Sequence, residues 1–397
     1  MNNTGHLRRV PHSGLVRAGL ASAGEAVLRF IRTNTVLSIA ILAALVTSCI
    51  VPPDSEYLGY FDFRTLSCLF ATLAVVKALA HVNFFSYLAA AIVRKTGTLR
   101  AAAAALVAIT YFGSMLIAND MALLTFLPLG YLVMSRTNND KYMAFTFILQ
   151  NTAANLGGML TPFGNPQNLY LYSRFAIPNA EFVSIMLPPF VLATLMIGGC
   201  CLLFPRTALS LEKSSDEASP ERGRTLLNFA VFTVSVLMVM RVIPFLIGLV
   251  IVTAVLLAAD RRALAEVDYP LLFTFVSFFI FAGNMSRIPA IHALFTRLLS
   301  GSVLLVSTLS CQCISNVPSA ILLSQFTENY RELLIGVNVG GVGTLISSLA
   351  SLITFREYTK RHPEKTRSYF LLFTAVSFGF LALLTTFSWI WLNWIAA

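Results

Sequence analysis

The chain has 397 residues, of which 57% are hydrophobic and only 12% are charged, and its formal net charge is +10. Because a soluble domain carries about a quarter charged residues, this composition excludes an ordinary soluble protein and indicates an all-α polytopic membrane protein. The basic residues stand in short clusters between apolar stretches, as the positive-inside rule describes, so the expected partner is membrane lipid and no nucleic acid.

The first elements are expected to start in the cytoplasm. Residues 1–33 form a basic lead-in, and residues 35–51 are long enough for a first crossing, which takes about 20 residues. The loop 52–62 has acidic and no basic residues, which indicates the outer face. Residues 63–81 return inward, and the half-amphipathic stretch 84–100 is expected to lie along the cytoplasmic interface.

The segment 101–134 is too long for one helix, and basic residues flank both of its ends. Its middle carries Ala118-Asn119-Asp120. A re-entrant hairpin with Asn119 and Asp120 at its tip keeps both basic ends in the cytoplasm. The alternative, one long tilted helix, would place like-charged ends on opposite faces. We therefore predict a hairpin.

Residues 142–174 are predicted to form a broken crossing, because 151–172 combine several glycines with Pro162 and Pro166. Gly costs about 1 kcal/mol and Pro about 3 kcal/mol in a helix interior. A break inside the membrane is tolerated only where the freed backbone groups line an enclosed, wet cavity. Two half-helices that meet at a polar break hold a small ion in many secondary transporters.

The second half is expected to repeat this plan. A crossing over 188–204 leads to a cytoplasmic linker, 207–224, and an extra crossing follows at 225–242. The further elements predicted, in order, are a crossing (244–259), a cytoplasmic loop (260–268), a crossing (271–285), an outer amphipathic helix (288–300), a second hairpin (302–326), a second broken crossing (333–355), a basic internal segment (356–367) and a last helix (369–391).

An internal repeat supports this division. Asn155-Leu-Gly-Gly-Met-Leu-Thr161 aligns without a gap on Asn338-Val-Gly-Gly-Val-Gly-Thr344, and Ala118-Asn119-Asp120 matches Ser315-Asn316-Val317. The charge pattern places the first hairpin inside and the second outside. We therefore predict inverted-topology repeats, 34–206 and 243–397, with about nine full crossings and two hairpins. This is the architecture of an alternating-access carrier.

Side chains at the breaks supply the candidate site. Amides and hydroxyls donate and accept, half-helix N-termini favour an anion, and unwound carbonyls suit Na⁺. The candidate substrate-binding residues are Asn119, Thr161, Pro162, Gly164, Asn165, Asn168, Ser315, Asn316, Thr344, Ser347 and Ser348. The candidate coupling-ion residues are Asp120, Asn119, Asn155, Gly158, Asn316, Asn338 and Gly341. No metal site and no cofactor other than the coupling Na⁺ or H⁺ are expected.

Two alternatives remain open for these residues. The glycines could serve close helix packing and the hydroxyls could bond to their own helices, which weighs most for Ser347, Ser348 and Ser351. Asp120 is the only carboxylate placed in the membrane interior. It could bind a proton or Na⁺, or it could cap a half-helix.

Three motifs stand at the breaks and hairpin tips: Asn119-Asp120-Met-Ala-Leu-Leu-Thr-Phe-Leu-Pro, Gly157-Gly158-x-x-Thr161-Pro162-x-Gly164-Asn165-Pro166-x-Asn168 and Gly336-Val-Asn338-x-Gly340-Gly341. They resemble the ion transporter superfamily, which includes citrate/dicarboxylate permeases (divalent anion:sodium symporters), arsenite-efflux permeases and certain sodium/proton antiporters. The resemblance covers most of the chain from Asp62 onward and implies a homodimer with scaffold and moving transport domains.

The chain departs from the dicarboxylate symporters at two places. They carry Ser-Asn-Thr at each hairpin tip, where this chain has Ala118-Asn119-Asp120 and Ser315-Asn316-Val317. The second break, Ser347-Ser348-Leu-Ala-Ser351-Leu, is more similar to the arsenite-permease branch.

These features together predict a secondary active transporter that moves a small anion, citrate/dicarboxylate-like or an inorganic oxyanion, across the cytoplasmic (inner) membrane by symport with Na⁺ or H⁺. A sodium/proton antiporter, with Asp120 as the exchanging group, is the alternative. An intramembrane enzyme is disfavoured because the five histidines are scattered and no nucleophile with a base is apparent.

Overall fold

The structure is a computed structural model that describes residues 29–31, 33–209 and 221–395. Within these ranges every regular element is a helix, and the one isolated β-bridge joins Thr98 to Ala208. Most of the predicted basic lead-in and the centre of the predicted linker lie outside the described residues. The all-helical fold class is therefore confirmed for the part of the chain that is described.

The helices follow the apolar stretches of the sequence closely. The first half contains α2 (Thr35–Ile50), α3 (Phe63–His81), α4 (Phe84–Val93), α5 (Leu99–Ile117), α6 (Asn119–Arg136), α7 (Met143–Gly157), α8 (Pro166–Arg174) and α9 (Asn179–Cys201). The second half contains α10 (Arg222–Val239), α11 (Phe245–Ala259), α12 (Arg261–Ala265), α13 (Tyr269–Arg287), α14 (Pro289–Gly301), α15 (Val303–Ile314), α16 (Asn316–Leu323), α17 (Tyr330–Val339), α18 (Leu349–Arg361) and α19 (Thr366–Ile390).

Six of the described helices are long and apolar enough to cross a membrane, or seven if the bent pair α14–α15 is one span. Several others, such as α2 and α11, are apolar but shorter. The protein is thus a multi-pass membrane protein. The predicted number of full crossings, about nine at about 20 residues each, stays a prediction.

Two predicted boundaries are wrong. Helix α9 begins at Asn179 and not at residue 188, because Pro188 and Pro189 lie inside it; membrane helices tolerate proline where neighbouring groups satisfy the freed carbonyls. The stretch 84–100 is not one element, since α4 ends at Val93 and the Thr98 hydroxyl caps the start of α5. Helix α18 continues through the first six residues of the basic segment 356–367, and the internal position of that segment stays a prediction.

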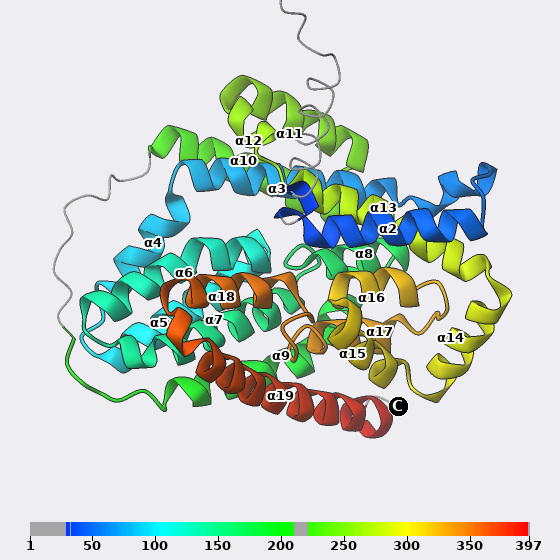
Figure 1. Ribbon diagram of the computed structural model, residues 1–397. Coiled ribbons are helices and arrows are strands. Elements are labelled where there is room, and N and C mark those ends of the chain that lie inside the picture. The colour runs from blue at the N-terminus through cyan, green and yellow to red at the C-terminus, as the bar shows by residue number, and fades with distance from the viewer. Residues whose placement is uncertain (1–28, 32, 210–220, 396–397) are drawn as a thin grey trace, which may run out of the picture.

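The helices form layers (Figure 1). Helices α3, α10 and α11 pack together along one side of the molecule, and α19 lies along the opposite side. Helix α2 packs lengthwise on α13, and α13 in turn contacts α16. Helices α5–α8 and α15–α18 occupy the space between these layers, so both predicted hairpins and both predicted breaks lie in the middle of the protein.

Both helical hairpins are present. Helices α5 and α6 pack against each other on either side of Ala118, and α15 and α16 do so on either side of Ser315. The two turn residues have nearly the same backbone angles, φ 63 and ψ 153 at Ala118 and φ 74 and ψ 160 at Ser315. Positive φ is uncommon for a residue with a side chain. The sides from which the hairpins enter the membrane remain predictions.

Both broken helices are present as well. Helix α7 ends at Gly157, a single 3-10 turn follows, and α8 begins at Pro166. Proline is well suited to that first position because its missing N–H would have no partner there. In the second half, α17 ends at Val339 and α18 begins at Leu349. Between them Gly343 has φ +143, a conformation that L side chains rarely adopt.

Candidate transport site

A cavity of about 580 Å³ lies where the two hairpin tips meet helices α2, α8, α13 and α18. Its volume falls in the range of small-molecule sites. The wall is largely apolar, with polar side chains gathered at the hairpin tips and nearby. These polar residues are Asn119, Asp120, Gln167, Thr274, Ser310, Cys313, Ser315 and Asn316.

Four helices begin at this cavity. The first-turn residues that line it are Asn119 and Asp120 of α6, Pro166 and Gln167 of α8, Asn316, Val317 and Pro318 of α16, and Leu349 and Leu352 of α18. Each helix N-terminus carries roughly half a positive elementary charge. Four such helix ends at one cavity favour a negatively charged group there, and Asp120 is the only charged residue among the described residues that line it.

The tip of the first hairpin is fastened to the first broken helix. The Asn119 side chain is 4% exposed. Its Oδ1 accepts from the backbone N–H of Asp120 at 2.9 Å, and its Nδ2 donates to Oδ1 of Asn155 at 3.2 Å. One asparagine therefore caps α6 and fixes the tip on α7.

The second tip repeats this capping. Oδ1 of Asn316 accepts from the backbone N–H of Val317 at 2.9 Å. The carbonyl of Ser347, in the second break, accepts from the Asn316 backbone N–H at 3.0 Å and from the Ser315 hydroxyl at 3.3 Å. Each hairpin tip is thus tied to the broken helix of its own half.

The two threonines that align in the repeat also make matching bonds. Thr161 donates its hydroxyl to the Met115 carbonyl at 2.9 Å, and Thr344 donates to the Gln312 carbonyl at 3.0 Å. Each acceptor lies three residues before the hairpin turn. The last carbonyls of a helix have no partner within it, so each threonine satisfies one orphan carbonyl of a hairpin arm.

Asn168 closes the first break. Its Nδ2 donates to the carbonyls of Gly158, Met159 and Thr161, each at 3.2 Å, and its Oδ1 accepts from Nδ2 of Asn338 at 2.6 Å. The side chain is fully buried. It therefore holds the backbone behind the cavity and links the two halves.

A polar network continues this link. Oδ1 of Asn338 accepts from Asn165 and from Gln167, each at 3.4 Å. Nδ2 of Asn151 donates to the Ser351 hydroxyl at 3.2 Å. Buried amides and hydroxyls are stable only when they are paired, so these contacts fix the two breaks relative to each other.

The glycines of the first break allow its loop to fold on itself. A Cβ added at Gly158 would lie 2.5 Å from Oδ1 of Asn165, and one added at Gly164 would lie 2.4 Å from the Gly158 carbonyl. No real Cβ approaches that closely. Gly341, the counterpart of Gly158, lies against the Asn316 amide.

The structure divides the candidate residues into two groups. Asn119, Asp120, Ser315 and Asn316 line the cavity. The remaining candidates lie in the backbone framework behind it: Asn155, Gly158, Thr161, Pro162, Gly164, Asn165, Asn168, Asn338, Gly341, Thr344, Ser347 and Ser348. Ligand binding by either group stays a prediction.

Sequence reasoning missed Gln167. It lines the cavity, and its Oε1 is buried without a hydrogen-bond partner among the described residues. The available signal was its position between Pro166 and Asn168, in the first turn after a helix break. Thr274 and Cys313 also line the cavity. Nothing in the sequence marks them, because threonine and cysteine are common in apolar helices that have no binding role.

Asp120 lies in the first turn of α6, where the positive end of the helix dipole favours an acidic side chain. Its Oδ1 is buried and has no hydrogen-bond partner within the described ranges. Binding of a proton or of Na⁺ by Asp120 stays a prediction.

Comparison with known proteins identifies the family. Residues 26–329 match the family described as citrate transporter. The chain belongs to the citrate transporter family. It is 30% identical over 321 residues to an uncharacterized transporter of Methanocaldococcus jannaschii, covering 81% of this chain and 87% of that protein. It is 29% identical over 337 residues to the inner membrane protein YbiR of Escherichia coli, covering 83% and 89%.

A 46 kDa membrane protein of Mycobacterium leprae is 23% identical over 368 residues, covering 81% of this chain and 85% of that protein. The resemblance to the ion transporter superfamily is confirmed by the family match. The protein is a membrane transporter of this family.

Proposed function

We propose that this citrate transporter family member is a secondary active carrier for a small anion, citrate/dicarboxylate-like or an inorganic oxyanion. The observation that carries the proposal is the convergence of four helix N-termini on one cavity. Backbone N–H groups and helix dipoles bind anions without any basic side chain. The cavity of about 580 Å³ is large enough for a small organic acid.

The coupling ion is assigned to Asp120. An ionised Asp120 repels an anion bound in the same cavity, whereas a protonated or Na⁺-bound Asp120 does not. Binding of the anion and of the cation is therefore mutually favourable, and this reciprocity is the thermodynamic basis of symport. The proposal is H⁺ or Na⁺ symport through this residue.

The paired geometry of the two halves supports alternating access. The hairpin turns have nearly equal backbone angles, and the aligned threonines make equivalent bonds. Inverted repeats of this kind rock or move against each other in carriers. We extend the proposal to a homodimer in the cytoplasmic membrane, in line with the superfamily resemblance and with the inner membrane protein of E. coli.

The test is counterflow in proteoliposomes loaded with unlabelled anion and supplied with radiolabelled citrate, succinate, sulfate or phosphate. At least one label should accumulate transiently, and Asn316→Ala should reduce that uptake because the α16 tip loses its cap. Asn393→Ala is the control, because Asn393 is exposed and is not among the residues that line the cavity. Absence of counterflow for the whole panel with folded protein would contradict the proposal.

A sodium/proton antiporter is the second candidate, and one observation favours it: among the described residues that line the cavity, Asp120 is acidic and none is basic. In vesicles without any organic or inorganic oxyanion, an antiporter would collapse an imposed pH gradient when Na⁺ is added. A proton–anion symporter would do so only when its anion is present.

A further inference from the structure

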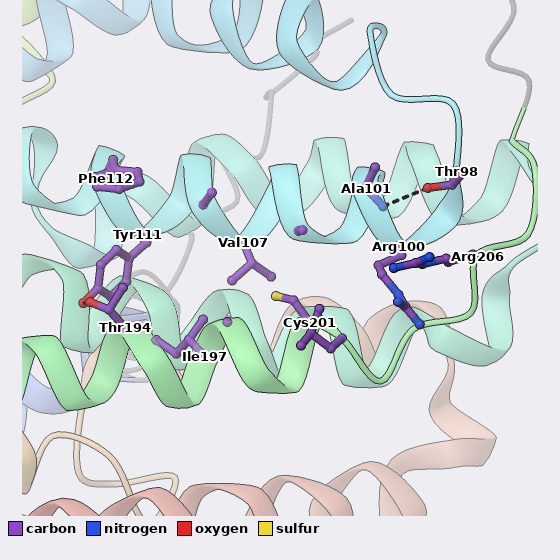
Figure 2. A pocket seen from close by; sticks show the side chains of 14 residues that line it. Thr98, Arg100, Ala101, Val107, Tyr111, Phe112, Thr194, Ile197, Cys201 and Arg206 are labelled. Carbon is purple, nitrogen blue, oxygen red and sulfur yellow. Dashed lines mark hydrogen bonds between the residues drawn. The ribbon is translucent and has the colours of Figure 1, made fainter.

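A second hollow lies between α5 and α9 (Figure 2). Its volume is about 560 Å³, and it shares no lining residue with the cavity at the hairpin tips. We propose that this α5–α9 groove binds one anionic phospholipid, with the phosphate at Arg100 and Arg206 and one acyl chain along the groove.

The groove exists because its walls are built from small residues. Helix α5 contributes Ala101, Ala104 and Ala108, and α9 contributes Gly198. A Cβ added at Gly198 would meet no atom within 4 Å. Between its two ends the larger lining residues, such as Val107 and Ile197, are apolar (Figure 2). A hydrocarbon chain suits such a surface, because inside the membrane apolar groups associate through close van der Waals packing and a narrow groove provides it.

The charge is confined to one end. Figure 2 shows Arg100 and Arg206 together at the end where α5 begins and α9 has just ended. The Arg100 Nε donates to the Phe204 carbonyl at 2.7 Å, which fixes that guanidinium, while Arg206 is exposed. Neither forms an ion pair with a carboxylate in the described part of the chain. Two guanidinium groups match a phosphate well, since each can donate two parallel hydrogen bonds.

The length matches one leaflet. Arg100 and Tyr111 are eleven residues apart on α5, a rise of about 16 Å, which is half of the roughly 30 Å hydrocarbon core. At the far end the Tyr111 hydroxyl pairs with the Thr194 hydroxyl at 2.7 Å, and the Tyr111 ring stacks on Phe190. That end therefore presents satisfied polar groups and an aromatic wall, as the end of an acyl chain requires.

These features together select a whole lipid over a free anion. A soluble phosphate would contact the two arginines and leave the apolar groove uncovered. A neutral lipid would fill the groove and leave the two guanidiniums without an anion. An anionic glycerophospholipid satisfies both parts at once, at a depth that places its headgroup at the interface.

Native mass spectrometry of the purified full chain tests this, with dioleoyl phosphatidylglycerol and dioleoyl phosphatidylcholine as probes. The phosphatidylglycerol should be retained more strongly. Arg206→Gln should weaken its retention about fivefold, since one basic residue near an anionic headgroup contributes about that factor. Arg136→Gln, which removes an exposed charge at the end of α6, should leave it unchanged.

The groove itself is tested by a matched pair of substitutions. Gly198→Phe fills it and should abolish retention. Gly199→Phe has equally open space around it but lies outside the lining and should retain the lipid. Equal retention of both lipids, retention by Gly198→Phe, or displacement of phosphatidylglycerol by glycerol 3-phosphate as readily as by whole lipid would each overturn the proposal.

Discussion

Asn168 shows how one buried polar side chain can hold a helix break together. Its donated bonds go to the carbonyls of Gly158, Met159 and Thr161 in the break after α7, and its accepted bond comes from Asn338 in the other half of the protein. Removing this amide takes a donor from the carbonyls of Gly158 and Met159, whereas the Thr161 carbonyl still accepts from the Gly164 N–H. That costs about 1–3 kcal/mol for each group left without a partner.

We therefore predict that Asn168→Ala lowers the free energy of unfolding by about 1–3 kcal/mol or more. Transport should fall only because less of the protein is folded. Thermal unfolding in detergent measures the first effect. Asn393→Ala is the control, since that side chain is exposed and donates to the Trp389 carbonyl. An unchanged midpoint for Asn168→Ala would mean that the break is held by other contacts.

Asp120 makes the opposite prediction, a loss of function without a loss of stability. Asparagine caps a helix about as well as aspartate and has nearly the same shape, but it carries no charge and binds no proton. Asp120→Asn should keep substrate counterflow and lose uptake driven by an imposed pH or Na⁺ step. The two steps are applied separately in proteoliposomes. A variant that still concentrates substrate under the same gradient as the parent would make Asp120 a structural cap.

The sequence predicts these residues unequally, for a physical reason. Asn119, Asp120 and Asn316 stand out because polar groups deep in an apolar stretch are expensive. Their position at hairpin tips follows from the charges at the segment ends. Gln167 was missed because polarity alone does not say which face of a short helix borders a cavity. That depends on the path of the neighbouring chain.

At the scale of elements, the breaks and hairpins were predictable and some helix ends were not. Glycine and proline mark the breaks, because a continuous helix does not tolerate several of them close together. The start of α9 was predicted at residue 188, yet the helix begins at Asn179 and runs through both Pro188 and Pro189. Local propensity is a weak guide where neighbouring helices and buried carbonyl partners compensate.

The fold of the first break gives an element-scale prediction. A methyl group at Gly158 would lie 2.5 Å from the Asn165 side chain and 2.8 Å from the Gly164 carbonyl. Gly158→Ala should therefore destabilise the protein by about 1–3 kcal/mol, as overpacking does, and reduce counterflow. Gly199→Ala, with nothing within 4 Å, should be neutral or stabilise α9 by up to about 1 kcal/mol. Thermal unfolding of both variants decides, and equal midpoints would contradict the close packing of the break.

At the scale of the whole molecule, the two halves correspond in detail. The same kind of turn, the same capping asparagine and the same threonine bond occur in each half. The hairpin tips meet at one cavity although they are far apart in the sequence. If the repeats are inverted, this common site can be opened to either side by moving the halves, which is the minimum requirement of a carrier.

Inversion makes a prediction about topology that is independent of transport. Single cysteines at Lys95 and Arg136, which flank the first hairpin, should both react with an impermeant thiol reagent from the cytoplasm. Cysteines at Gly301 and Glu328, which flank the second hairpin, and at Glu56, in the loop after α2, should react from outside. The exposed native Cys49 and Cys313 are first replaced by serine, and vesicles of both orientations are compared.

The physical basis is the positive-inside rule, which keeps the basic ends of the first hairpin on one side. Labelling of Lys95 and Arg136 from opposite faces would show that the first hairpin crosses the membrane completely, and the inverted arrangement of the two halves would then be wrong.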